Sequence, residues 1–100
     1  MQVTRQSSIQ KTSPPFRYEV RYERSFLLDL KRLEPAARHI IQSFVFQDFF
    51  QINQIQELPE CRQIGSSEIY YRFTLDRYLI SLEVMGQIIK FLRVIRKPDL

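Results

Sequence analysis

The sequence predicts an α+β fold of order β-α-α-β-β-β, in which a helical hairpin packs on a small, mainly antiparallel sheet. An alternating segment near the N-terminus indicates a half-buried strand, two apolar stripes at helical spacing follow, and three β-rich runs close the chain. The three runs are joined by the two-residue links Asp76-Arg77 and Gly86-Gln87, which are too short for a parallel crossover. The last three strands are therefore expected to form an antiparallel meander.

Size and composition limit the possible classes of protein. One hundred residues suit a single domain, and a hydrophobic content of 44% is enough for a packed core. No apolar run reaches the roughly 18–20 residues of a membrane span. No apolar stretch follows the first charges of the sequence, so a secretory signal is not expected. We therefore expect a cytoplasmic protein with no membrane partner. The lone Cys61 has no Cys or His cluster with which to share a metal ion, so no metal and no cofactor is expected.

The N-terminal part divides into a leader and a strand. Residues 1–15 are polar and end in a Pro-Pro pair, which predicts a flexible leader ahead of a domain that spans residues 16–100. Residues 16–23, FRYEVRYE, alternate between apolar and charged side chains, as a half-buried strand does.

Two helices should follow this strand. Ser25 is expected to cap a short first helix, which Glu34-Pro35 interrupts. Pro35 suits the first turn of a second helix, because its missing N–H would have no intrahelical partner there. Apolar residues at helical spacing extend that helix through about residue 51. The polar residues 52–67 are expected to form a long loop.

Strand alternation sorts the side chains of the meander, expected at residues 68–75, 78–85 and 88–95, into two faces. Simple alternation puts Phe91 and Arg93 on the same side of the last strand, which is apolar on both faces, so its phase stays open. If Arg93 shares the outer face, a polar cluster forms there that Arg96 is near enough in sequence to join. The members of this cluster would be Arg72, Thr74, Ser81, Glu83, Arg93 and Lys97.

The charge is uneven along the chain. The formal net charge is +4, and residues 61–100 carry seven basic and four acidic residues. This balance favours the C-terminal part as the face for an anionic partner such as RNA, although ordinary surface charge explains it equally well.

Three segments together resemble the RelE/ParE family of bacterial toxin–antitoxin toxins. They are YEVRYERSFLLDLKRL (18–33), the helix start EPAARHI, and IYYRFTLDRYLISLEVMGQIIKFLRVIRKPDL (69–100). The last segment is similar to the family's three-strand signature. No single motif is specific, but their order and spacing together are.

The resemblance implies a small cytoplasmic toxin that a cognate antitoxin holds inactive. RelE-type members enter the ribosomal A site and cut mRNA without a metal, which inhibits translation, whereas ParE-type members inhibit DNA gyrase and cut nothing. Function must therefore be argued from the site rather than from the shared fold.

The resemblance also implies site residues, with departures. Arg72, Arg96 and Lys97 match catalytic positions, and with Arg93 they would bind RNA. Thr74 and Leu79 stand where RelE-type members place cations, and the sequence stops at Leu100, one residue before the usual tyrosine. The expected function is a ribosome-dependent mRNA endoribonuclease. The alternatives are a non-nuclease inhibitor of gyrase and a degenerate member that only binds its antitoxin.

Overall fold

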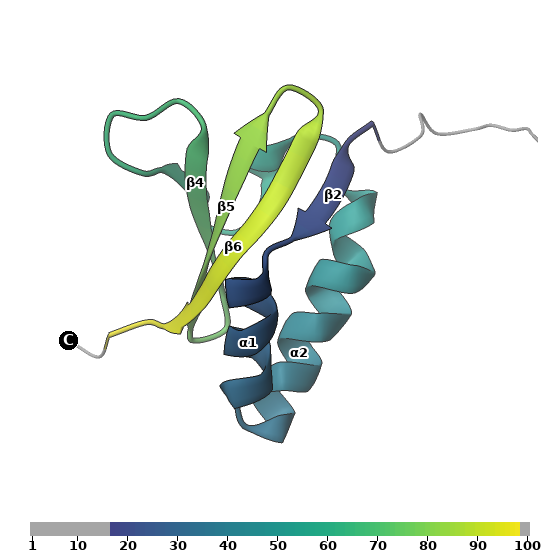
Figure 1. The fold of residues 1–100 in the computed structure, drawn as a ribbon, viewed down its shortest axis with the longest axis vertical. Helices are drawn as coiled ribbons and strands as arrows, with labels where there is room; N and C mark the ends of the chain where they lie inside the picture. Colours follow the sequence, from purple (N-terminus) through teal and green to yellow (C-terminus); the bar gives the residue numbers. More distant parts are fainter. Residues whose placement is uncertain (1–16, 99–100) are drawn as a thin grey trace, which may run out of the picture.

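The computed structural model describes residues 17–98, so the leader predicted for residues 1–15 lies outside the described part. One five-stranded sheet has the strand order β2-β6-β5-β4-β3, and two helices pack beside it (Figure 1). The predicted α+β class is confirmed. The elements are β2 (Glu19–Tyr22), α1 (Arg24–Arg32), α2 (Pro35–Phe46), the 3-10 turns η2 (Asp48–Gln51) and η3 (Ile55–Glu57), β3 (Arg62–Gln63), β4 (Tyr70–Leu75), β5 (Tyr78–Met85) and β6 (Ile88–Arg96).

The predicted meander is present: β4, β5 and β6 pair antiparallel in sequence order. Their links turn at Asp76 and Gly86, with φ values of 56° and 59°, and the second position uses the freedom of glycine in the left-handed region. β2 is the exception, because it pairs parallel with the outer side of β6. The helical hairpin supplies the crossover that a parallel pair requires.

The core lies between the helices and one face of the sheet. Phe26 from α1, Phe49 from η2 and Phe91 from β6 are fully buried, and the Phe91 ring lies 5.2 Å from that of Phe26 and 5.0 Å from that of Phe49, centroid to centroid. Tyr22 stacks on the same Phe91 ring, and its hydroxyl donates a hydrogen bond to the Val45 carbonyl at 2.9 Å. This aromatic cluster joins β2, β6 and both helices, and it leaves the opposite, outer face of the sheet uncovered by helix.

Two of the expected segments are wrong. The second helix ends at Phe46 rather than near residue 51, because Gln47 departs from helical geometry and a 3-10 turn then carries Phe49 into the core. The expected loop 52–67 contains the turn η3 and the strand β3. Two residues are too few for a periodic signal, so β3 exists through its pairing with β4 rather than through its own pattern.

Ser25 does not cap α1. The helix begins at Arg24, its N-cap Glu23 makes no side-chain cap, and the Ser25 hydroxyl donates to the Leu92 carbonyl of β6 at 2.7 Å. One turn further on, Asp29 Oδ2 accepts a hydrogen bond from the Val94 N–H at 2.9 Å. α1 thus continues along the edge of β6 where β2 ends (Figure 1), and its side chains satisfy backbone groups that an open edge would expose.

A β-bulge resolves the phase of β6. Leu82 pairs with Phe91 and Ser81 with Arg93, so Leu92 is an extra residue on this strand. The extra residue reverses the alternation, because Phe91 and Val94 both face the core while Arg93 is exposed. Simple alternation could not predict this arrangement.

Candidate functional site

A hollow of about 340 Å³ opens on the outer face of the sheet, near the C-terminal end of β6. Neighbouring elements supply its walls: the turn after η3, then β3, β4, β5 and the residues that follow β6. Glu60 has a φ of 51°, and this left-handed turn leads directly into β3. The lining residues are Glu60, Arg62, Arg72, Thr74, Leu79, Lys97 and Pro98.

Two arginines of the hollow are direct cross-strand partners. Arg62 on β3 lies opposite Arg72 on β4, and both are exposed. Like charges placed directly opposite one another destabilise a sheet. Within residues 17–98, neither guanidinium forms an ion pair. A locally unfavourable arrangement without a compensating contact is typical of a functional site.

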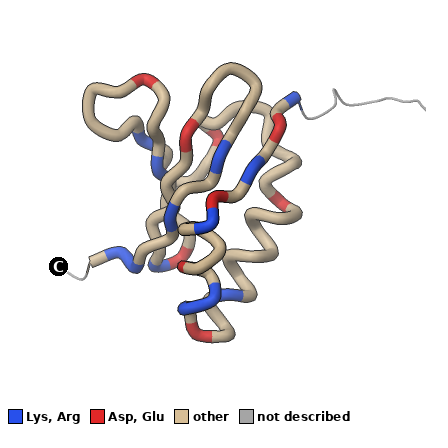
Figure 2. Tube along the Cα trace, in the orientation of Figure 1, with Lys and Arg blue, Asp and Glu red and all other residues tan. Residues whose placement is uncertain are grey.

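A third cation, Lys97, completes the charged wall. Its N–H donates to the Arg77 carbonyl at 2.7 Å, which fixes the backbone just after β6. Its ammonium lies 3.7 Å from the carboxylate of Glu60. The hollow therefore has three cations against one carboxylate, which favours an anionic ligand. Figure 2 shows blue segments beside β4 and near the C-terminal end of β6.

The opposite wall is uncharged. Thr74 and Leu79 are cross-strand partners on β4 and β5, and both are half-buried. Leu79 thus lies on the outer face, as the strand alternation predicts. It offers neither a charge nor a hydrogen-bond donor to a ligand in the hollow.

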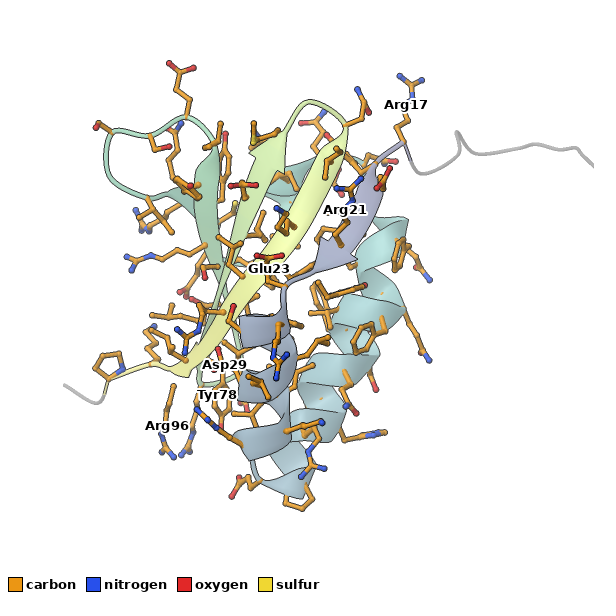
Figure 3. The ribbon with its side chains drawn as sticks, viewed as in Figure 1. Arg17, Arg21, Glu23, Asp29, Tyr78 and Arg96 are labelled. Atoms are coloured by element: carbon orange, nitrogen blue, oxygen red, sulfur yellow. The ribbon has the colours of Figure 1, made fainter. Side chains whose placement is uncertain are left out.

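Arg93, a predicted RNA-binding residue, is engaged elsewhere. Its Nε and Nη2 donate to the two carboxylate oxygens of Asp29 at 2.8 and 3.0 Å. The hydrogen bond from Arg93 lowers the pKa of Asp29, burial opposes that shift, and the Val94 N–H lowers it further. The same carboxylate raises the pKa of Arg93. The pair fastens α1 to β6 (Figure 3 labels Asp29).

Arg96 lies apart from the outer hollow. It is the cross-strand partner of buried Tyr78, and Figure 3 labels both residues. Both line a second hollow of about 250 Å³ beside the start of α2. Asp76 and Glu34 also line this second hollow, so cations do not dominate it. Of the predicted site residues, the structure therefore brings together Arg72 and Lys97.

The remaining candidates take ordinary structural places. Glu83 lies 3.8 Å from Lys90, its cross-strand partner, rather than near Arg93. Burial raises the pKa of the half-buried Cys61 thiol. No group of His, Cys, Asp or Glu side chains suited to a metal ion occurs in residues 17–98. In the same range, no helix is long and apolar enough to cross a membrane.

Sequence reasoning missed three residues that shape this region. Arg62 and Glu60 fall in the segment predicted as a loop, where no periodicity marks them. Asp29 carried a usable signal, because it stands four residues after Ser25 and so shares its helix face. A polar pair on one face of an otherwise amphipathic helix indicates a contact with a polar partner, here the edge of β6.

Comparison with known proteins identifies the fold. No family model and no curated protein matches the chain. Among solved structures, a chain of the RelB–RelE antitoxin–toxin complex from Methanococcus jannaschii is 26% identical, with a TM-score of 0.63 over 76% of this chain and 88% of that one. A chain of the archaeal RelE–RelB complex from Pyrococcus horikoshii OT3 is 18% identical, with a TM-score of 0.65 over 84% of this chain and 99% of that one.

A chain of the toxin–antitoxin complex RelBE2 from Mycobacterium tuberculosis is 19% identical, with a TM-score of 0.63 over 84% of this chain and all of that one. These matches define the class: an α+β protein with the fold of RelE-type toxins. The resemblance to the RelE/ParE family, expected from the sequence, is thereby confirmed.

Proposed function

We propose that this chain is the toxin of a toxin–antitoxin pair and that it cuts mRNA on the ribosome, which inhibits translation. The observation that carries the proposal is the outer hollow, in which Arg62, Arg72 and Lys97 face one carboxylate. Such an excess of cations suits the phosphates of RNA, and the RelE-type fold supports the choice of substrate.

The proposed chemistry requires no metal. The 2′-hydroxyl of RNA gives up its proton and attacks the adjacent phosphorus, a 2′,3′-cyclic phosphate forms as the bond from phosphorus to the 5′-oxygen breaks, and the leaving 5′-oxygen takes a proton from water. Arg72 and Lys97 neutralise the charge that grows on the phosphate oxygens, which is the largest contribution such a site can make. Glu60 supplies the one carboxylate that lines the hollow, and in this proposal it accepts the proton of the 2′-hydroxyl.

The proposal includes a cognate antitoxin. The structural neighbours were solved as complexes of toxin with antitoxin. This chain also exposes large apolar side chains, which a protein partner would cover. They include Leu27 and Leu28 on α1, Ile40 and Phe46 on α2, and Ile95 on β6.

The uncharged wall favours a second candidate. Leu79 and Thr74 supply no cation, and Ile95, the cross-strand partner of Leu79, is exposed. A protein target such as DNA gyrase would suit this apolar strip, as would an antitoxin alone. In the first case the chain is a toxin that cuts nothing, and in the second it is only an interaction module.

Mapping the 5′ ends of mRNA after induction of the chain alone in a bacterial host tests the proposal. We expect new ends within translated codons, and we expect the double variant Arg72→Gln/Lys97→Gln to lose them. Removing one phosphate-binding group commonly lowers a rate about 10²–10³-fold. Arg21→Gln is the matched control, because Arg21 is an exposed cation on distant β2.

The other outcomes separate the candidates. Growth arrest without new ends contradicts the nuclease and points to gyrase or another protein target. Cuts that persist in the double variant contradict the assigned site but not the nuclease. An absence of both arrest and cuts leaves the interaction module.

A further inference from the structure

We propose that the β3–β4 edge is a binding subsite for one nucleotide of single-stranded RNA, in which Arg62 and Arg72 hold a phosphate and Tyr70 stacks on the base. This inference rests on the proposed function, because it takes RNA to be the ligand of the outer face. It adds residues from β3 and from the start of β4 to the site.

The register places the two halves of this subsite next to each other. Arg62 pairs with Arg72, and two residues further along both strands the Ile64 N–H donates to the Tyr70 carbonyl at 2.8 Å. Because side chains two residues apart share a face, Arg62, Ile64, Tyr70 and Arg72 all lie on the outer face. The two arginines therefore lie beside the aliphatic side chain of Ile64 and the aromatic side chain of Tyr70, which are two residues away along the same strands.

The backbone holds this edge in place although β3 has only two residues. The Thr74 N–H donates to the Pro59 carbonyl at 2.9 Å, so hydrogen bonds at Pro59 and Ile64 anchor the segment on both sides of Arg62. The site is thereby pre-organised, and binding need not order the chain first.

Tyr70 and Ile64 are apolar side chains that do not pack in the core, so another contact must account for their exposure. Tyr70 is 38% exposed and Ile64 is 40% exposed, although neighbouring Phe73 is fully buried. Proteins that bind single-stranded RNA combine exposed aromatic rings with cations, because every base has a flat face that stacks on such a ring. A purely apolar protein contact would not account for the unpaired arginines beside it.

Two of the three acidic groups near the subsite are already engaged. Glu83, the cross-strand partner of Tyr70, lies 3.8 Å from Lys90. Glu60 lies 3.7 Å from Lys97. Their partners offset both carboxylates, which leaves the two arginines against one exposed carboxylate, that of Glu68, two residues before Tyr70.

Binding to a short fluorescent RNA, methylated at its 2′-oxygens so that it cannot be cut, tests the subsite by anisotropy over a range of salt. Replacing Tyr70 by Leu keeps the apolar surface but removes stacking, and we expect affinity to fall about 5- to 100-fold. Tyr70→Phe retains the ring and should bind within about twofold of the parent chain. Thermal unfolding curves establish that each variant folds.

The cation half of the subsite has its own signature. Arg62→Gln should weaken binding and lower the slope of log affinity against log salt by about one, whereas Tyr70→Leu should leave that slope unchanged. Arg21→Gln, which removes the same charge from the opposite edge of the sheet, is the control and should have a smaller effect.

Each contrary result overturns the subsite. If the parent chain does not bind this RNA, the subsite is wrong. New mRNA ends mapped in cells would in that case still support the proposed function. Unchanged affinity in Arg62→Gln and Tyr70→Leu leaves the edge to a protein partner. If Arg62→Gln and Arg21→Gln lower the affinity for RNA equally, the net charge of the protein explains the loss and the subsite does not.

Discussion

Asp29 is the residue on which the attachment of α1 to β6 most depends. Its carboxylate is 8% exposed and accepts three hydrogen bonds, two from the Arg93 guanidinium and one from the Val94 N–H. A buried carboxylate with this set of donors stays ionised, because each donor favours the charged form. The contact therefore depends on pH.

Replacing Asp29 by Asn should destabilise the protein by about 1–3 kcal/mol at pH 7, since a charged hydrogen bond is lost from a buried site. The folded pKa of Asp29 lies below its unfolded value. Its contribution is therefore fully present above about pH 5 and is lost as the pH falls through the folded pKa. The difference between parent and variant in chemical denaturation should shrink from pH 7 to pH 3.

Glu68→Gln, a change of an exposed carboxylate in the loop before β4, controls for general acid effects. This variant should follow the parent chain at both pH values. A destabilisation by Asp29→Asn that stays constant between pH 7 and pH 3 would contradict the role of the ionised carboxylate.

Strand alternation correctly predicted which face of the sheet some of the site residues occupy, but it failed for others. Arg72 and Leu79 lie on the outer face as expected, because β4 and β5 alternate without interruption. Arg93 and Arg96 could not be placed from sequence, because their facing depends on the bulge at Leu92, which only the pairing with β5 reveals. Arg62 escaped notice because its strand is too short to have a pattern.

At the scale of elements, the bulge at Leu92 decides which side chains of β6 face the core. It lies where β2 ends and α1 takes over the edge, and the Leu92 carbonyl accepts the Ser25 hydrogen bond. One extra residue thus turns Arg93 toward Asp29 and keeps Val94 in the core. Without it, the same strand would direct a charged side chain inward.

Deleting Leu92 tests this role of the bulge. The deletion restores simple alternation and directs either Arg93 or Phe91 to the wrong face, so we expect a loss of at least about 3 kcal/mol or failure to fold. Leu92→Ala keeps the extra residue and serves as the control, with a smaller loss. The measurement is thermal unfolding by circular dichroism. A deletion variant as stable as the control would contradict the account.

The elements with strong periodicity were predicted well, and the ones set by tertiary pairing were not. β5 was predicted at residues 78–85 and occupies Tyr78–Met85, because apolar side chains alternate along its full length. The parallel pairing of β2 with β6 and the existence of β3 depend on contacts between distant segments, which no local pattern encodes.

At the scale of the whole molecule, the two faces of the sheet have different tasks. One face builds the core against the helices (Figure 1), and the other presents the cationic hollow lined by Arg62, Arg72 and Lys97. Arg93, which is paired with Asp29, and Arg96, which lines the second hollow, lie away from the outer hollow, so charge alone does not define the site. We predict that Arg72 and Lys97 act on RNA there, although Leu79 leaves one wall uncharged.

Cleavage of a defined mRNA by the purified chain, with and without ribosomes programmed with that mRNA, is the most direct test of this claim. Primer extension should reveal cuts only when ribosomes are present. The double variant Arg72→Gln/Lys97→Gln should lose these cuts. The control Arg93→Gln removes a cation of the ion pair with Asp29, and once circular dichroism establishes that it is folded, it should keep the cuts. Absence of cuts by the parent chain on programmed ribosomes, or undiminished cutting by the double variant, would contradict it.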